Sequence, residues 1–172
     1  MSQENNAGIV NEFKFLDVGT LSDGEIEVVV KEKQPADDKK GYVPGYEFEI
    51  RLLGKPDPIG RVGLRIGNTK RVIMDIGHIG YEIKENYRGH RYAAKACNLV
   101  KSIAVAHGLQ TLWILCDPGN IASRRTCEIL GCDLVEIVNI PEGSEMYQRG
   151  ERQACRYRWD LENYNEARRV WS

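Results

Sequence analysis

The sequence predicts a single mixed α/β domain, with a twisted and mostly antiparallel sheet of six to seven strands. Two observations lead to this fold class. The first half of the chain alternates apolar and polar residues in short runs separated by turn residues, which is typical of an antiparallel meander. A stretch with helical periodicity then lies between two strand-like runs, which is the pattern of a βαβ crossover. The length of 172 residues suits one domain with a full core.

The composition is that of an ordinary globular protein. Apolar residues make up 42% and charged residues 28% of the chain, and the formal net charge is −1. A balanced charge gives no field that would attract nucleic acid or a membrane surface. We find no apolar run of about eighteen residues and no signal peptide at the polar N-terminus, so a cytoplasmic protein is expected.

The cysteines are odd in number and follow no metal-binding pattern. There is no C-x-x-C, and no histidine has the spacing of a zinc ligand. We therefore predict no metal site and expect free thiols in a reducing compartment. The five are Cys97, Cys116, Cys127, Cys132 and Cys155.

The start of the chain contains one ambiguous run. Ser22 and Glu25 have the spacing of a capping box, which would open a helix. Three consecutive valines and the alternation Glu-Ile-Glu-Val favour a strand over residues 24–33 instead. We interpret this run as a strand, after an extended piece at 13–18 and before a polar loop at 34–45. Residues 1–11 are expected to be disordered.

Three strands follow in quick succession. Residues 46–53 alternate as a strand with one solvated face, and residues 59–66 return as a second strand after a short turn. Residues 71–83 are predicted to form a long third strand. Its apolar phase slips near Gly77 and His78, which is the effect of a β-bulge.

The centre of the chain joins a strand to a long amphipathic helix. Residues 79–83 end the third strand, and residues 86–91 (NYRGHR) form a tight basic turn. Residues 92–107 then place apolar side chains at steps of three and four, with Gly108 as a left-handed cap. The first amides of a helix have no acceptor inside it and carry the positive end of its dipole. This turn is therefore predicted to hold a phosphate-bearing ligand.

The last third of the chain completes the βαβ unit. Residues 111–116 are apolar on both faces, as in a strand inside a sheet, and are expected to run parallel to the strand ending at Ile83. Asn120 is an N-cap for a helix that reaches Leu130 and ends at Gly131. Two further strands, 134–140 and 154–161, and a weakly helical tail at 162–172 follow.

Two motifs carry a resemblance to a known family. Arg88 and Ala93 match the ends of the pyrophosphate turn Arg/Gln-x-x-Gly-x-Gly/Ala, although Arg91 stands where the pattern has glycine. The second motif is Asn120-x-x-Ser123-x-x-x-x-Glu128-x-x-Gly131. In these residues the chain resembles the GNAT superfamily of acetyl-CoA-dependent N-acetyltransferases. The resemblance implies a βαβ acyl-CoA cleft, with acetyl-CoA as co-substrate and no metal.

The resemblance also implies a set of cofactor-binding residues. The amides of the turn, with two arginines, would bind the pyrophosphate, and the backbone of residues 82–84 would pair with the pantetheine arm. The start of the second helix would contact the same arm. The full set is Glu82, Ile83, Lys84, Arg88, Gly89, His90, Arg91, Tyr92, Ala93, Asn120, Ser123 and Arg124.

The reaction implied is direct attack of an amine on the thioester in a ternary complex. A base must first take a proton from the ammonium group, and the candidates are Asp75, His78 and Glu82. The family often uses a tyrosine to protonate the departing thiolate, and here that position is Cys127, which either donates the proton or only packs. The catalytic prediction is His78, Glu82 and Cys127.

The predicted function is acetyl transfer from acetyl-CoA to a primary amine of a small molecule or a protein N-terminus. The short loop at 34–45 predicts an open or partner-completed acceptor site, and a homodimer is possible. The alternative is a non-catalytic acyl-CoA-binding sensor, which the departures at Arg91 and Cys127 motivate. A nucleotide-binding role ranks third, because no Walker or Gly-x-Gly-x-x-Gly pattern is present.

Overall fold

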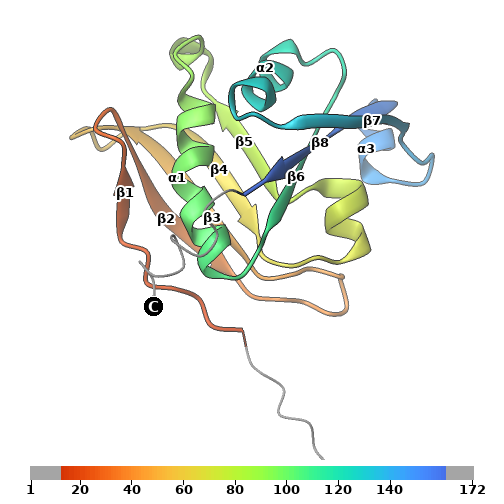
Figure 1. Cartoon of the computed structure of the whole chain (residues 1–172), viewed down its shortest axis with the longest axis horizontal. Helices are drawn as coiled ribbons and strands as arrows, with labels where there is room; N and C mark the ends of the chain where they lie inside the picture. The colour runs from red at the N-terminus through yellow and green to blue at the C-terminus, as the bar shows by residue number, and fades with distance from the viewer. Residues whose placement is uncertain (1–12, 162–172) are drawn as a thin grey trace, which may run out of the picture.

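The computed structural model describes residues 13–161, so the predictions for 1–11 and 162–172 lie outside the described residues. The mixed, mostly antiparallel α/β fold is confirmed (Figure 1). Within residues 13–161 there are eight strands, in one sheet of five and one of three. The sequence had predicted one sheet of six to seven strands, and β1 is the strand that it missed.

The larger sheet has the strand order β1-β2-β3-β4-β5, and every neighbouring pair is antiparallel. The run at 24–33 is a strand, as predicted. One face of this sheet carries the core side chains of β2, β3 and β4, and the other is polar. The strands are β1 (Thr20–Ser22), β2 (Ile26–Gln34), β3 (Gly45–Leu52), β4 (Pro58–Arg65) and β5 (Ile79–Ile83).

The long third strand predicted for residues 71–83 is wrong in its first half. Residues Arg71–Ile76 form a short π-helix, η1, and β5 begins only at Ile79. The slip near Gly77 marks this boundary, because Gly77 has φ 76° and a Cβ there would lie 2.8 Å from the Trp113 carbonyl oxygen. The pattern of η1 resembled a strand because one turn of helix is too short to show its periodicity.

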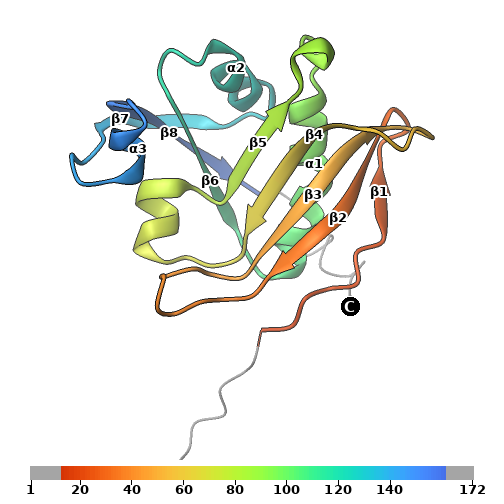
Figure 2. The same cartoon turned by 180° about the vertical axis from the view of Figure 1, so that it is seen from behind.

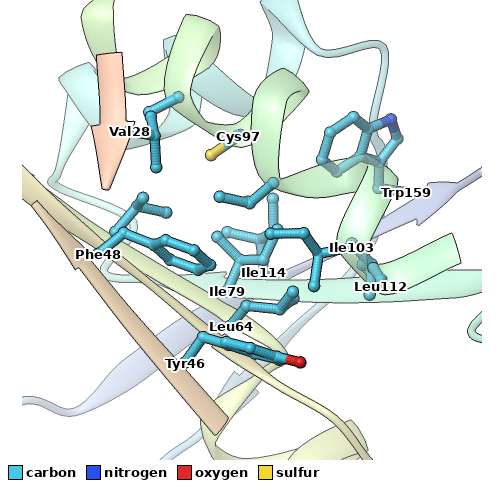
Figure 3. Packing of buried hydrophobic residues seen from close by; sticks show 14 of the residues in the cluster. Val28, Tyr46, Phe48, Leu64, Ile79, Cys97, Ile103, Leu112, Ile114 and Trp159 are labelled. Carbon is cyan, nitrogen blue, oxygen red and sulfur yellow. The ribbon is translucent and has the colours of Figure 1, made fainter. Parts of the chain in front are cut away.

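The helix α1 (Tyr92–Ala106) covers the apolar face of the larger sheet and matches the predicted range within one residue. Gly108 has φ 89°, as predicted for the cap. Figure 3 shows side chains of α1 packed against both sheets, with Leu64 and Ile79 from the larger one and Leu112 and Ile114 from the smaller. The predicted stripe also included His107, which is half-buried. The other six residues of the stripe are buried: Ala93, Ala96, Cys97, Val100, Ile103 and Ala104.

The smaller sheet has the order β6-β8-β7 and is antiparallel. Helix α2 (Ile121–Ile129) follows β6, with Asn120 as its N-cap and Gly131, at φ 78°, after its end, as predicted. The strands are β6 (Thr111–Cys116), β7 (Asp133–Asn139) and β8 (Gln153–Asp160), and the short helix α3 (Glu145–Gln148) lies between β7 and β8.

The two sheets meet at one point. The His78 amide donates a hydrogen bond to the Trp113 carbonyl oxygen at 2.7 Å, where β5 and β6 approach each other. Beyond this point the two strands belong to separate sheets and diverge (Figure 2). The parallel pairing predicted for them is therefore reduced to this contact.

Two properties of the described residues complete the fold. All five cysteines are free thiols, as predicted. In the described part of the chain, no helix has the length and hydropathy that a bilayer crossing requires.

Candidate active site

A cavity of about 470 Å³ lies between the end of β5, the turn that opens α1, and the first turns of α2. The structure places nine of the twelve predicted cofactor-binding residues around it. These are Glu82, Ile83, Arg88, Gly89, Arg91, Tyr92, Ala93, Asn120 and Ser123. Lys84, His90 and Arg124 do not line it; Arg124 instead donates hydrogen bonds to the Tyr157 hydroxyl and the Pro118 carbonyl.

The cavity has further lining residues that the sequence analysis missed. Tyr81 and Tyr87 line it near the cofactor turn. The others come from one face of α2, at steps of three and four, so the helical periodicity after Asn120 is the signal that could have identified them. They are Ala122, Arg125, Thr126 and Ile129.

The turn that opens α1 presents unpaired backbone donors. A single 3₁₀ turn, η2 (Glu85–Tyr87), leads into it, and Gly89 takes φ 88°. Arg91 is the N-cap of α1 but makes no side-chain cap hydrogen bond. The amides of the first helical turn therefore lack an intrahelical acceptor, and the helix dipole adds positive potential at this end of the cavity.

Arg91 adopts the left-handed conformation that the family pattern reserves for glycine. Its φ is 62° and its ψ is 23°, and among the described residues it is the only non-glycine with positive φ. A left-handed residue with a Cβ costs about 1–2 kcal/mol. The turn thus has the left-handed backbone conformation expected of the family's glycine, and the residue that adopts it here is an arginine that lines the cavity.

The outer edge of β5 is available for a ligand. Lys84 donates its amide to the Ile59 carbonyl in β4 at 2.8 Å. Because the peptide groups of a strand point alternately to either side, those of Tyr81 and Ile83 face away from β4 and toward the gap before β6. The Ile83 carbonyl already accepts a hydrogen bond from Arg88 Nε at 2.9 Å, which fixes that side chain beside the strand.

The start of α2 forms the opposite wall. The Asn120 side-chain oxygen accepts the Ser123 amide at 3.1 Å and so caps the helix. Ser123 Oγ lies 2.8 Å from the Tyr81 hydroxyl, and this contact joins α2 to β5 across the inner end of the cavity.

Cys127 lies behind this wall. Its side chain is fully buried and does not line the cavity, and its Sγ is 3.8 Å from the Tyr81 hydroxyl. A hydrogen bond with Cys116 lowers the pKa of Cys127, but a hydrogen bond with Cys132 and burial raise it, to about 12. Its predicted role as the acid stays a prediction, and the phenol of Tyr81 stands between it and the cavity.

His78 is fully buried at the junction of the sheets. It lines neither this cavity nor the second cavity, which is described below. Its Nδ1 accepts the Trp113 amide at 2.9 Å, so the proton is on Nε2, which lies 3.0 Å from Asn68 Oδ1. Burial lowers the pKa of His78 to about 4. Both nitrogens are occupied within the fold. The other candidate base, Asp75, is exposed on η1 and also lies outside both cavities.

A second cavity of about 260 Å³ lies on the polar face of the larger sheet. Arg61 lines it, and its guanidinium lies 3.1 Å from a carboxylate oxygen of Glu47 and 3.6 Å from one of Glu82. Among the described residues, Glu82 is the one that lines both cavities. The alternation of residues 46–53 predicted a solvated face here but gave no sign of a hollow. The lining residues are Lys31, Glu47, Glu49, Pro58, Gly60, Arg61, Glu82 and Lys84.

Comparison with known proteins shows the family of the chain. The family model described as an acetyltransferase (GNAT) domain matches residues 10–133, which is more than half of the chain. The chain belongs to the GNAT acetyltransferase family. The predicted resemblance is thereby confirmed, and the chain is an acetyl-CoA-dependent N-acetyltransferase by family. No curated protein matches the sequence.

Solved GNAT structures share the fold at low sequence identity. The ribosomal-protein-S5-alanine acetyltransferase of Vibrio fischeri is 13% identical, with a TM-score of 0.63 over 84% of this chain and 98% of its own. RimL, a ribosomal L7/L12 alpha-N-protein acetyltransferase, is 14% identical with a TM-score of 0.57, over 82% and 96% of the two chains. MccE, in complex with acetyl-CoA and AMP, is 18% identical with a TM-score of 0.54, over 68% and 61%.

Proposed function

We propose that this GNAT protein transfers the acetyl group of acetyl-CoA to a primary amine that enters the second cavity, with Glu82 as the base. The observation that carries the proposal is that Glu82 lines both the cavity at the start of α1 and the cavity on the polar face of the larger sheet. An acetyl donor in the first and an amine in the second would approach each other across the edge of β5.

The first cavity suits the cofactor in charge and in shape. The free amides at the start of α1, together with Arg91 and Arg125, offer donors and positive charge for the diphosphate. The pantetheine arm would pair with the outward peptide groups of β5 and carry the thioester to the inner end of the cavity. There the Tyr81 amide is the donor that would polarise the thioester carbonyl.

Glu82 is the candidate base that reaches the acceptor cavity. Its side chain is 68% exposed and its carboxylate lies 3.6 Å from Arg61. An amine attacks only when it is neutral, so Glu82 or a water bound to it would take the ammonium proton. His78 has no free nitrogen for this step, and Asp75 lies on η1, away from both cavities.

The acceptor is best explained as an amine at the end of a polypeptide. In the described part of the chain, no helix covers the polar face of the larger sheet, which Figure 2 shows facing the viewer with α1 behind it. An open face accommodates an extended chain better than it encloses a small molecule. Two structural neighbours are described as acetyltransferases of ribosomal proteins, which supports this acceptor class.

The experiment is a CoA-release assay with acetyl-CoA and a panel of peptides and small amines, preceded by calorimetry of CoA binding. We expect turnover with peptide N-termini, and a loss of tenfold or more in Glu82→Gln. The matched control is Glu49→Gln, because Glu49 lines the acceptor cavity but bonds to Arg51 at 2.7 Å. Binding without turnover on any amine would favour the acyl-CoA sensor, and absence of CoA binding would refute both readings.

Free cysteines also support a lesser proposal. A cytoplasmic location suits five unpaired thiols, which persist in a reducing compartment. The homodimer named in the sequence analysis stays a prediction, which analytical ultracentrifugation tests directly.

A further inference from the structure

We propose that the Tyr81 hydroxyl donates a hydrogen bond to the CoA sulfur as the thioester breaks, and that Ser123 positions this hydroxyl. The inference rests on the proposed function, since it assigns a residue to the departure of CoA. It differs from the sequence prediction, which placed this role at Cys127.

The strand β5 carries the proposed base, Glu82, and the proposed hydrogen-bond donor to sulfur, Tyr81, on successive residues. Neighbouring side chains of a strand point to opposite faces, so Glu82 reaches the polar face and Tyr81 the face covered by α1 and α2. Tyr81 lines the cofactor cavity and its hydroxyl meets the first turn of α2. Because the strand joins the second sheet three residues earlier, at His78, the Tyr81 hydroxyl lies at the inner end of the cavity.

The hydrogen bonds around Tyr81 leave its proton available. Ser123 Oγ lies 2.8 Å from the Tyr81 oxygen, and the Ser123 carbonyl lies 3.3 Å away. When the serine hydroxyl donates to Tyr81, the phenolic proton has two longer contacts within the described residues, to the Ser123 carbonyl at 3.3 Å and to Cys127 Sγ at 3.8 Å. Both contacts are weak hydrogen bonds, so the proton can turn to the CoA sulfur in the cavity.

Ser123 is itself held in place. Its amide donates to the Asn120 side chain at 3.1 Å, which fixes the first turn of α2. The serine hydroxyl is thereby directed at β5, and it acts through Tyr81 as a positioning residue. This arrangement explains how a helix with cysteine at position 127 still presents a hydroxyl group to the cavity.

The phenol remains protonated throughout the reaction. Burial raises the pKa of Tyr81, so at neutral pH the hydroxyl is a donor and not an anion. Transfer of its proton to a thiolate would be unfavourable, because a thiol is the stronger acid. Tyr81 therefore stabilises the developing negative charge on sulfur by a hydrogen bond and keeps its proton.

The bonds and protons balance without another reactant. The amine nitrogen forms a bond to the carbonyl carbon, the carbon–sulfur bond breaks, and its electron pair stays on sulfur. The nitrogen loses two protons to water by way of Glu82, the ammonium proton before the attack and a second one as the amide forms, so that one proton is released overall once CoA is protonated. CoA departs as the thiolate, hydrogen-bonded to Tyr81, and takes a proton from water.

The test measures the pKa of the thiol of bound CoA from the ultraviolet absorbance of its thiolate. Desulfo-CoA serves as the blank, which subtracts the protein's own tyrosines. We expect Tyr81→Phe to raise this pKa by about one unit, a tenfold change in thiolate population, and to lower kcat about tenfold or more. Ser123→Ala should give a smaller change in the same direction.

Tyr147→Phe is the matched control, because Tyr147 lies on α3 and lines neither cavity, and no hydrogen bond of its hydroxyl is found within the described residues. It should leave the thiol pKa and kcat unchanged. A lower kcat and melting temperature in Tyr81→Phe with an unchanged thiol pKa would show a structural role and overturn the inference. If wild-type protein does not bind CoA at all, the proposed function itself fails, and this inference with it.

Discussion

Replacing Arg91 with glycine is expected to stabilise the fold and to weaken the binding of CoA. Arg91 has φ 62°, a conformation that costs a residue with a Cβ about 1–2 kcal/mol. Glycine removes that strain but gains unfolded-state entropy of about 0.5–1 kcal/mol. The difference is a gain of about 0.5–1 kcal/mol, which in a chain of this size raises the melting temperature by about 2 °C.

The effect on binding has the opposite sign. Arg91 is exposed at the mouth of the cofactor cavity, so solvent screens its attraction to a diphosphate. A screened charge-assisted contact of about 1 kcal/mol corresponds to about a fivefold rise in the Kd for CoA. Calorimetry of CoA binding and thermal unfolding of the free protein measure the two effects separately.

Arg91→Ala separates strain from charge. Alanine keeps the Cβ in the left-handed conformation and loses the guanidinium, so it should weaken CoA binding as glycine does without the gain in stability. If Arg91→Gly melts no higher than Arg91→Ala, the strain argument is wrong. If both variants bind CoA as wild type does, Arg91 does not face the diphosphate.

Three further predictions concern the fold that supports the site. Burial holds the pKa of His78 near 4, below the ordinary 6.5, so the unfolded state alone binds its proton as the pH falls. Stability should therefore be full above about pH 6.5 and decline toward pH 4 by about 3 kcal/mol, and urea midpoints across this range should show a flatter decline in His78→Gln. Gly77→Ala should destabilise by more than about 2 kcal/mol in urea unfolding, since its Cβ would lie 2.8 Å from the Trp113 oxygen. Gly24→Ala is the control, because Gly24 has φ 90° and a Cβ there would meet no atom within 4 Å, so this variant carries the backbone strain without a clash. Its loss of stability should be smaller than that of Gly77→Ala, and an equal loss would contradict the clash. Asn120→Ala removes the cap of α2 and should lower stability by about 1 kcal/mol, and an unchanged melting temperature would count against the cap.

Local features of the sequence predicted much of the fold. The cap at Asn120, the glycine after each long helix and the stripe of α1 are properties of neighbouring residues, so they could be recognised without a structure. The turn at residues 88–93 was recognised in the same way, as a pattern followed at once by helical periodicity. Most of the predicted cofactor residues belong to these local features.

What the sequence missed depends on contacts between distant residues. His78 was a candidate base because its ordinary pKa suits neutral pH, but its burial against Trp113 comes from the meeting of two sheets. Tyr81 gained a role only from its contact with Ser123, 42 residues later in the chain. The second cavity is likewise lined by residues from β2, β3, β4 and β5, which lie far apart in the sequence, so no single run of residues predicts it.

The single junction of the sheets has a consequence for which acyl groups the enzyme accepts. Within the described residues, the backbone hydrogen bond between His78 and Trp113 is the one that links the start of β5 to β6. The separation of the two strands beyond that point is therefore set by the core under them, where α1 packs on Ile79 and Ile114 (Figure 3). Enlarging or shrinking those interior side chains would alter the angle between the sheets. Tolerance for longer acyl chains can thus be tuned from inside the protein, with every ligand-facing residue left in place.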